Sequence, residues 1–233
     1  MPNFSLYGGT EVEDGQSSNG GPGTAGTSWA NIRNATTGSF SSDSFAIISC
    51  SAALYSGRGA NFYDVARAWL WFDFSAFTPG DSGTEITDIV LCIYRHGGPN
   101  TDVWAVRHDA PSCHVSTVEH VFFPSHDPAG GDSMTAYSSV NTEGTGDYNT
   151  FTLNATAIAE ANACKGASGN GGYGNKSFEV ALVAGQDYSN TEPTDNTESA
   201  NFRSQNYSGT GSDPYLKVVY TVAGADNATF FGA

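Results

Sequence analysis

The sequence predicts an all-β fold, specifically a two-sheet jelly-roll β-sandwich with one short helix. Short runs of β-branched and aromatic residues recur along the chain, and turn-forming residues, including 28 glycines, cluster between them. Hydrophobic residues make up 39% of the 233 positions, which is enough bulk for a core between two sheets. A parallel α/β fold would need a helix between successive strands, and only one segment offers helical periodicity. One sandwich domain is therefore expected.

Residues 66–74 (ARAWLWFDF) carry the clearest strand pattern in the chain. Alternate positions of this segment are apolar and are expected to face the core: Ala68, Leu70, Phe72 and Phe74. The opposite face carries Trp69 and Trp71 between an arginine and an aspartate. Two large aromatic rings are unusual on a solvated face, so this side is expected to be covered by a loop or by a partner.

Other strands are expected wherever short apolar runs lie between turns, namely at residues 45–50, 86–95, 103–108, 118–123, 148–153, 178–184, 200–204 and 215–222. The segment 86–95 is apolar on both faces and is expected to be central. The expected helix begins after its N-cap residue, Asn154, and has apolar residues at helical spacing: Ala155, Ile158, Ala159 and Ala163. The sandwich then spans residues 41–222, between a polar, glycine-rich arm or long loop (1–40) and a C-terminal tail (223–233).

Net charge excludes two classes of partner. Nine basic residues against 24 acidic residues give a net charge of −15, which repels phosphate backbones and anionic lipid surfaces. Binding to nucleic acid or to a membrane is therefore not expected. The first residues lack a basic cluster followed by an apolar stretch, so the protein is expected to be made in a host cytoplasm. Its four cysteines are accordingly expected to be reduced.

Three tryptophans are candidate contact residues for a protein partner or a glycan: Trp29, Trp69 and Trp71. Carbohydrate-binding sandwiches stack sugars on aromatic rings of an exposed sheet face, which Trp69 and Trp71 could provide. The alternative is that these rings lie buried under the N-terminal segment, the commoner fate of large aromatic side chains.

Residues 187–201 (DYSNTEPTDNTESAN) form an acidic loop, whose carboxylates are candidate calcium ligands: Asp187, Glu192, Asp195 and Glu198. Hard oxygen ligands on a flexible loop are what calcium requires. The segment lacks the residue order of an EF-hand, and the alternative is a solvated acidic loop. Calcium is the one cofactor that the sequence suggests.

Catalytic motifs do not point to an enzyme. Residues 80–83 (GDSG) resemble the nucleophile motif of chymotrypsin-like proteases, but those proteases place a histidine before the serine, and all five histidines here follow Ser82. Histidines, Cys113 and acidic residues are scattered through residues 108–127, yet their spacing matches no standard zinc or iron site.

Several segments, in chain order, resemble the DNRLRE-type jelly-roll module: residues 67–73 (RAWLWFD), the Pro79-Gly80 turn, and residues 86–94, 151–158, 178–187, 201–204 (NFRS) and 212–218 (SDPYLKV). The resemblance covers roughly residues 29–222 and rests mainly on core positions, so it bears on fold more than on ligand. The module recurs in surface-layer and cell-wall proteins, polysaccharide-active enzymes and phage virion proteins. Residues 28–38 (SWANIRNATTG) also resemble the entry to its phage versions.

The resemblance implies a non-catalytic virion structural protein rather than a cell-wall protein, because the sequence begins with methionine and stands alone. We expect a capsid decoration or cement protein of a bacteriophage that binds the assembled shell. Its partners would be other virion proteins, and it would form a homo-oligomer on the particle. The alternative is a carbohydrate-binding module or a tail-fibre adhesin with a glycan ligand.

Overall fold

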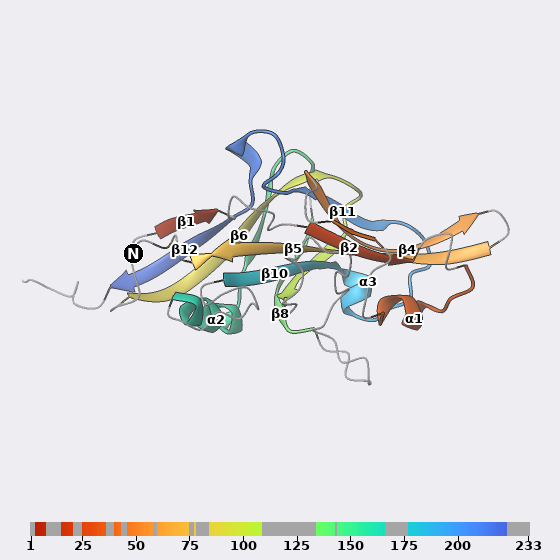
Figure 1. The fold of residues 1–233 in the computed structure, drawn as a ribbon, viewed down its shortest axis with the longest axis horizontal. Coiled ribbons are helices and arrows are strands. Elements are labelled where there is room, and N and C mark those ends of the chain that lie inside the picture. The colour runs from red at the N-terminus through yellow and green to blue at the C-terminus, as the bar shows by residue number, and fades with distance from the viewer. Residues whose placement is uncertain are drawn as a thin grey trace, which may run out of the picture.

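The structure, a computed structural model, describes residues 3–7, 15–20, 25–35, 40–42, 46–57, 60–74, 77, 84–108, 134–142, 144–165 and 177–222. Most of these residues lie in strands, and neighbouring strands pair antiparallel (Figure 1). The predicted all-β class is therefore confirmed. The strand expected at residues 118–123 and the tail at 223–233 lie outside the described residues.

The strands in chain order are β1 (Asn3–Tyr7), β2 (Gly15–Gly20), β3 (Phe40–Ser42), β4 (Ile47–Gly57), β5 (Ala60–Asp73), β6 (Thr84–Gly97), β7 (Asp102–Arg107), β8 (Ala136–Asn141), β9 (Tyr148–Thr152), β10 (Ser177–Ala184), β11 (Glu198–Arg203) and β12 (Tyr215–Val222). The helices are α1 (Trp29–Arg33), α2 (Ala155–Lys165) and α3 (Gly185–Tyr188), with a 3-10 turn, η3, at Thr210–Ser212. Every expected strand that lies in the described part of the chain is present.

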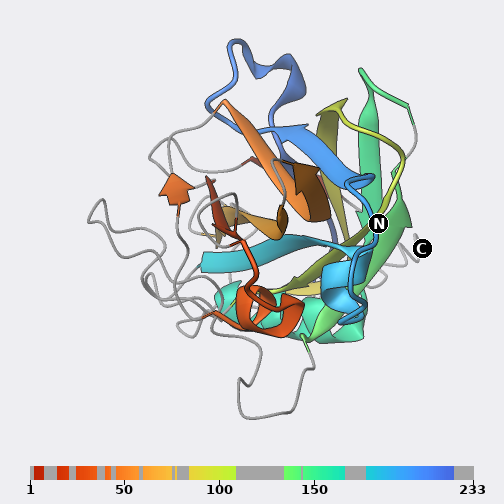
Figure 2. The same ribbon diagram turned by 90° about the vertical axis from the view of Figure 1, so that its right-hand side faces the viewer.

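The strands form one continuous, curled sheet, with the order β1-β12-β6-β11-β4-β5-β10-β7-β8 along its main path. Strand β9 pairs with β6, β2 pairs with β5, and β3 pairs with β2. Because β6 pairs with β12, β9 and β11, its predicted central position is confirmed. The helices α1, α2 and α3 lie along one side of the strands in both views (Figures 1 and 2).

The curled sheet encloses one main core, to which both of its ends contribute. In β5 the alternation predicted from the sequence is confirmed, since Leu70 and Phe72 belong to this core. They meet Leu91 of β6 and Leu216 of β12 from the other end of the sheet. Burying such a side chain contributes about 1.5–3 kcal/mol relative to leaving it exposed.

Helix α2 confirms the predicted N-cap but corrects the predicted face. The Asn154 side-chain oxygen accepts hydrogen bonds from the backbone amides of Thr156 and Ala157, which would otherwise lack partners at the helix start. The buried side chains are those of Ala157, Ala161, Cys164 and Lys165, whereas Ala155, Ala159 and Ala163 are exposed. Alanines occupy both faces of this helix, so their spacing did not distinguish the core side from the solvent side.

The expectation of one short helix and a 40-residue arm is also corrected. Helices α1 and α3 are additional one-turn elements, too short to produce a detectable period. Within the expected arm, β1 pairs with β12 along its whole length, and β2 pairs with β5. A polar strand such as Gly15–Gly20 is stabilised by ladder hydrogen bonds to its neighbouring strands. Its sequence has no alternation of hydrophobic residues, so the sequence pattern does not reveal the strand.

Candidate functional site

The tryptophans predicted to contact a glycan or a partner are all buried. The exposed fractions are 6% for Trp29, 3% for Trp69 and 9% for Trp71. Trp29 belongs to α1 and packs against Tyr63 of β5, with 5.7 Å between ring centroids. Trp69 stacks on His108 at 6.2 Å with an angle of 16° between the ring planes. The chain therefore covers this outward face of β5 itself, and these rings offer no face to a sugar.

A close imidazole–carboxylate pair lies on the same covered face. Nδ1 of His108 is 2.8 Å from Oε2 of Glu179, and both side chains are almost fully buried. Glu179 lies opposite Trp71 in the pairing of β10 with β5. A general acid or base has to come within hydrogen-bond reach of a substrate. The burial of this pair instead suits a contact that ties the end of β7 to β10.

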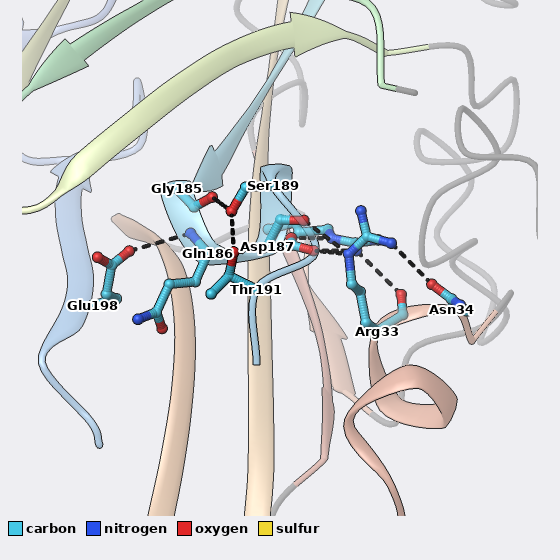
Figure 3. Close-up of polar contacts among 9 residues, drawn as sticks. Arg33, Asn34, Gly185, Gln186, Asp187, Ser189, Thr191 and Glu198 are labelled. Atoms are coloured by element: carbon cyan, nitrogen blue, oxygen red, sulfur yellow. Dashed lines mark hydrogen bonds and ion pairs between the residues drawn. The ribbon is translucent and has the colours of Figure 1, made fainter. Parts of the chain in front are cut away.

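Asp187 is the centre of a buried ionic cluster (Figure 3). Its carboxylate accepts two hydrogen bonds from Arg67, at 2.5 Å from Nε and 2.6 Å from Nη2, and lies 3.4 Å from Nε of Arg33. Arg33 also donates to the Asp187 carbonyl at 2.8 Å, and Arg67 donates to the Arg33 carbonyl at 3.1 Å. These bonds fasten α1 and α3 to β5, which explains how the two short helices are held in place.

The carboxylates predicted as calcium ligands are not brought together. Asp187 is paired with arginines, and Glu198 on β11 accepts a hydrogen bond from the Gln186 amide on the other side of α3 (Figure 3). Glu192 accepts a hydrogen bond from the Tyr63 hydroxyl, and Asp195 binds the hydroxyl and amide of Thr197. Within the described ranges no three His, Cys, Asp or Glu side chains form a group that could hold a metal ion. Each carboxylate thus has its own local partner.

A second aromatic face lies on the outer side of β1, β12, β6 and β9, and here the rings are accessible. The strand register places Tyr7 opposite Tyr215, Tyr215 opposite Cys92, and Tyr94 opposite Tyr148. The alternate residues of β12 and β6, such as Leu216 and Leu91, point into the core. Tyr7 is 54% exposed, and the other three tyrosines are partly exposed.

These tyrosines form a continuous row of ring contacts. Centroid distances are 5.4 Å for Tyr7–Tyr215, for Tyr215–Tyr148 and for Tyr148–Tyr94. The row continues to the guanidinium of Arg203, which lies 4.3 Å from the Tyr94 ring centroid and 4.0 Å from that of Tyr207. We call this row the tyrosine stripe; its members are Tyr7, Tyr215, Tyr148, Tyr94, Arg203 and Tyr207.

Hydrogen bonds fix the orientation of the rings in the stripe. The Tyr94 hydroxyl donates to the Gly146 carbonyl at 2.6 Å, and the Tyr148 hydroxyl donates to the Asp213 carbonyl at 3.2 Å. The hydrogen bond of the Tyr215 hydroxyl with the Cys92 sulfur, together with burial, raises the pKa of Tyr215 to about 12. Burial is the main cause that raises the pKa of Tyr148. The stripe is therefore a preorganised aromatic surface.

Comparison with family models and with curated proteins assigns no family to this chain. No family model and no curated protein matches this chain. In the described residues, no helix has the length and hydropathy needed to cross a membrane.

The sequence reasoning overlooked the tyrosine stripe because most of its members are distant along the chain. They come from five strands and one loop, and the strand register brings the four strand tyrosines together. The signal that could have found them is the outward position of one tyrosine in each of three predicted strands: Tyr94, Tyr148 and Tyr215. Alternation places such residues on the face opposite the core. Tryptophan drew attention instead because its ring is larger.

Proposed function

We propose that this protein is a non-catalytic attachment domain that decorates an assembled protein shell and contacts it through the tyrosine stripe. The exposed, hydrogen-bonded row of aromatic rings on one sheet face carries the proposal. Tyrosine and arginine are enriched at the energetic centres of protein interfaces, because they bury much surface at a low cost in side-chain entropy. In the stripe they are already held in place, which lowers that cost further.

The angles between the rings favour a protein surface over a polysaccharide as the ligand. A sugar chain stacks on ring faces that are presented side by side, whereas the Tyr148 plane lies at 73° to Tyr215 and 88° to Tyr94. Edge-to-face rings form an uneven apolar surface that suits the close packing of a protein interface. A glycan ligand, as in a carbohydrate-binding module or tail-fibre adhesin, remains the competing outcome of the test.

The finer fold and the biological setting are part of the same proposal. We assign the curled sheet to the two-sheet jelly-roll class and the chain to the DNRLRE-like modules of phage virions, where it would act as a capsid decoration or cement protein. The common core between the two ends of the sheet supports the fold assignment. A domain that binds the assembled shell better than its separate subunits stabilises the shell by mass action, and repeated copies multiply a modest contact.

Thermal disruption of purified particles that contain or lack the protein tests this function. We expect particles without it to break at a lower temperature, and added wild-type protein to restore the wild-type midpoint. The double variant Tyr7→Ala/Tyr215→Ala should fail to restore it, because both changes remove exposed ring surface from the stripe.

The matched control is Tyr55→Ala, which removes a ring with 36% exposure from the distant β4–β5 hairpin. This variant should restore the midpoint fully. An unchanged midpoint in particles that lack the protein, combined with saturable binding in a glycan screen, would contradict the decoration role and favour the carbohydrate-binding or adhesin alternative.

A further inference from the structure

Most of the basic side chains in the described residues bind groups of the chain itself. Seven of its nine lysines and arginines lie in the described residues. Arg33 and Arg67 bind Asp187, and Arg107 lies 3.5 Å from Glu160. Arg95 donates to the carbonyls of Gly98 and Pro99, and Lys165 donates to the Thr84 carbonyl. These five are bound to groups of the chain itself.

The two remaining described cations, Arg203 and Lys217, both lie on the outer face that carries the tyrosine stripe. Arg203 stacks on two rings of the stripe and donates a hydrogen bond to the Ser212 hydroxyl at 3.0 Å. Lys217 lies on β12 two residues beyond Tyr215, opposite Val90. Neither forms an ion pair with a carboxylate among the described residues, although the chain has 24 acidic residues. The stripe is thus an aromatic and cationic region on a protein of net charge −15.

Two carboxylates lie near the two cations, but neither forms an ion pair with them. Asp88 lies on the same face of β6, opposite Val219 and therefore diagonal to Lys217. The Asp213 charge is close enough to Tyr148 to raise the pKa of its hydroxyl, and burial raises the pKa of Asp213 itself. The Lys217 charge is close enough to Cys92 to lower the pKa of that thiol, although burial raises it more. Lys217 is exposed and Arg203 is partly exposed, and neither is paired with a carboxylate of the described residues, so both can meet an acidic ligand.

The exposed edges of the rings, like the two cations, favour an anionic ligand. The edge of an aromatic ring carries partial positive charge, and the perpendicular arrangement of Tyr148 and Tyr94 presents edges as well as faces. The hydroxyls of Tyr94, Tyr148 and Tyr215 are engaged within the chain, so few donors remain for the many hydroxyl groups of a sugar. This surface complements carboxylate side chains with aliphatic stems.

We infer that the tyrosine stripe binds an acidic polypeptide segment, supplied by the shell protein to which the domain attaches. This inference rests on the proposed function and adds the chemistry of the partner. Glutamate and aspartate of the segment pair with Arg203 and Lys217, and its apolar stems pack on the tyrosine rings. Charge complementarity of this kind selects the partner and speeds association.

Fluorescence anisotropy with a rhodamine-labelled oligoglutamate peptide tests the inference on the full chain. We expect saturable binding that weakens as the ionic strength rises from about 0.1 to about 1 M, where the Debye length falls from ~10 to ~3 Å. Unlabelled polygalacturonate should compete poorly. In Arg203→Gln/Lys217→Gln the dissociation constant should rise about 3- to 10-fold.

The matched control is Arg107→Gln, which removes one cation outside the stripe and should leave binding unchanged. Lys217→Glu serves as a second variant, because Lys217 is exposed and its replacement should leave the fold intact, which a circular dichroism spectrum of the variant checks. Equal binding by wild type and both stripe variants would overturn the inference, as would tighter binding of polygalacturonate than of oligoglutamate.

If particle attachment is lost in Tyr7→Ala/Tyr215→Ala but not in the charge variants, the inference fails and the proposed function stands. If attachment survives all of these changes, the proposed function fails.

Discussion

Two aromatic sheet faces of this protein point away from the main core, and they have opposite fates. On β5 and β10 the rings of Trp69 and Trp71 are buried by the chain itself, and farther along the same face of β5 the ionic cluster of Asp187 fastens α1 and α3. On β12 and β6 the tyrosine stripe stays accessible, and hydrogen bonds only orient its rings. An outward aromatic face is therefore a binding surface only where the rest of the chain leaves it open.

Removal of the Asp187 carboxylate should have the largest effect on stability. Asp187→Ala leaves two buried guanidinium groups without their anion, so the free energy of unfolding should fall by ~3–5 kcal/mol. Urea unfolding monitored by tryptophan fluorescence measures this change. Asp195→Asn, on the exposed part of the same loop, should change stability by less than ~0.5 kcal/mol. Similar losses in both variants would show that the ionic cluster does not hold α1 and α3 on β5.

Truncation of one ring on each face tests the comparison itself. Trp71→Ala should lower the free energy of unfolding by about 3 kcal/mol, because removal of this buried ring opens a cavity. Tyr7→Ala should change it by no more than ~0.5 kcal/mol, because that ring is mostly exposed. Denaturant melts of the two variants supply both values. The comparison would break if Tyr7→Ala proved as destabilising as Trp71→Ala.

Alkaline pH should reveal the hydrogen bond of Tyr215 with Cys92. An unfolded tyrosine ionises near pH ~10, whereas the pKa of Tyr215 is raised to about 12 in the folded protein. The unfolded state therefore loses this proton first, so the contribution is fully present below pH ~10 and is lost as the pH rises toward 12. Tyr215→Phe should flatten the fall of the unfolding midpoint over this range. Parallel pH profiles for wild type and variant would argue against the hydrogen bond.

The smallest expected signal concerns the thiols. Cys50, Cys92 and Cys164 are buried thiols that form no disulfide, and burial is the main cause that raises the pKa of Cys50 to about 12. Since the thiolate is the reactive form, Cys50 should react with Ellman's reagent at neutral pH only after denaturation. Rapid labelling of Cys50 in the folded protein, identified by mass spectrometry, would contradict its burial.

The sequence predicted the parts of the fold that depend on local alternation. Residues 66–74 predicted both the strand and its core face, because large side chains alternate there without interruption. Asn154 predicted the helix start, because an N-cap acts within one turn. Strands β1 and β2 were missed, because their pairing partners, β12 and β5, lie far away in the sequence.

The site was harder to predict for a related reason. The sequence identified Trp69 and Trp71 as an outward pair, but their burial depends on residues far along the chain, such as His108, which stacks on Trp69, and Glu179, which lies opposite Trp71. The four strand tyrosines of the stripe depend on the register of β1, β12, β6 and β9, and no two of them lie in one local window of the sequence. Spacing along one segment therefore could not show which aromatic face is open.

Hydroxyl-radical footprinting of the free and particle-bound protein tests the central claim most directly. In the free protein Tyr7 and Tyr215 should be oxidised readily, and Trp69 and Trp71 should be protected by the chain. On attachment Tyr7 and Tyr215 should become protected, while the tryptophans should show no change. Continued oxidation of Tyr7 and Tyr215 in the bound protein, with new protection on a different face, would contradict the tyrosine stripe as the contact surface.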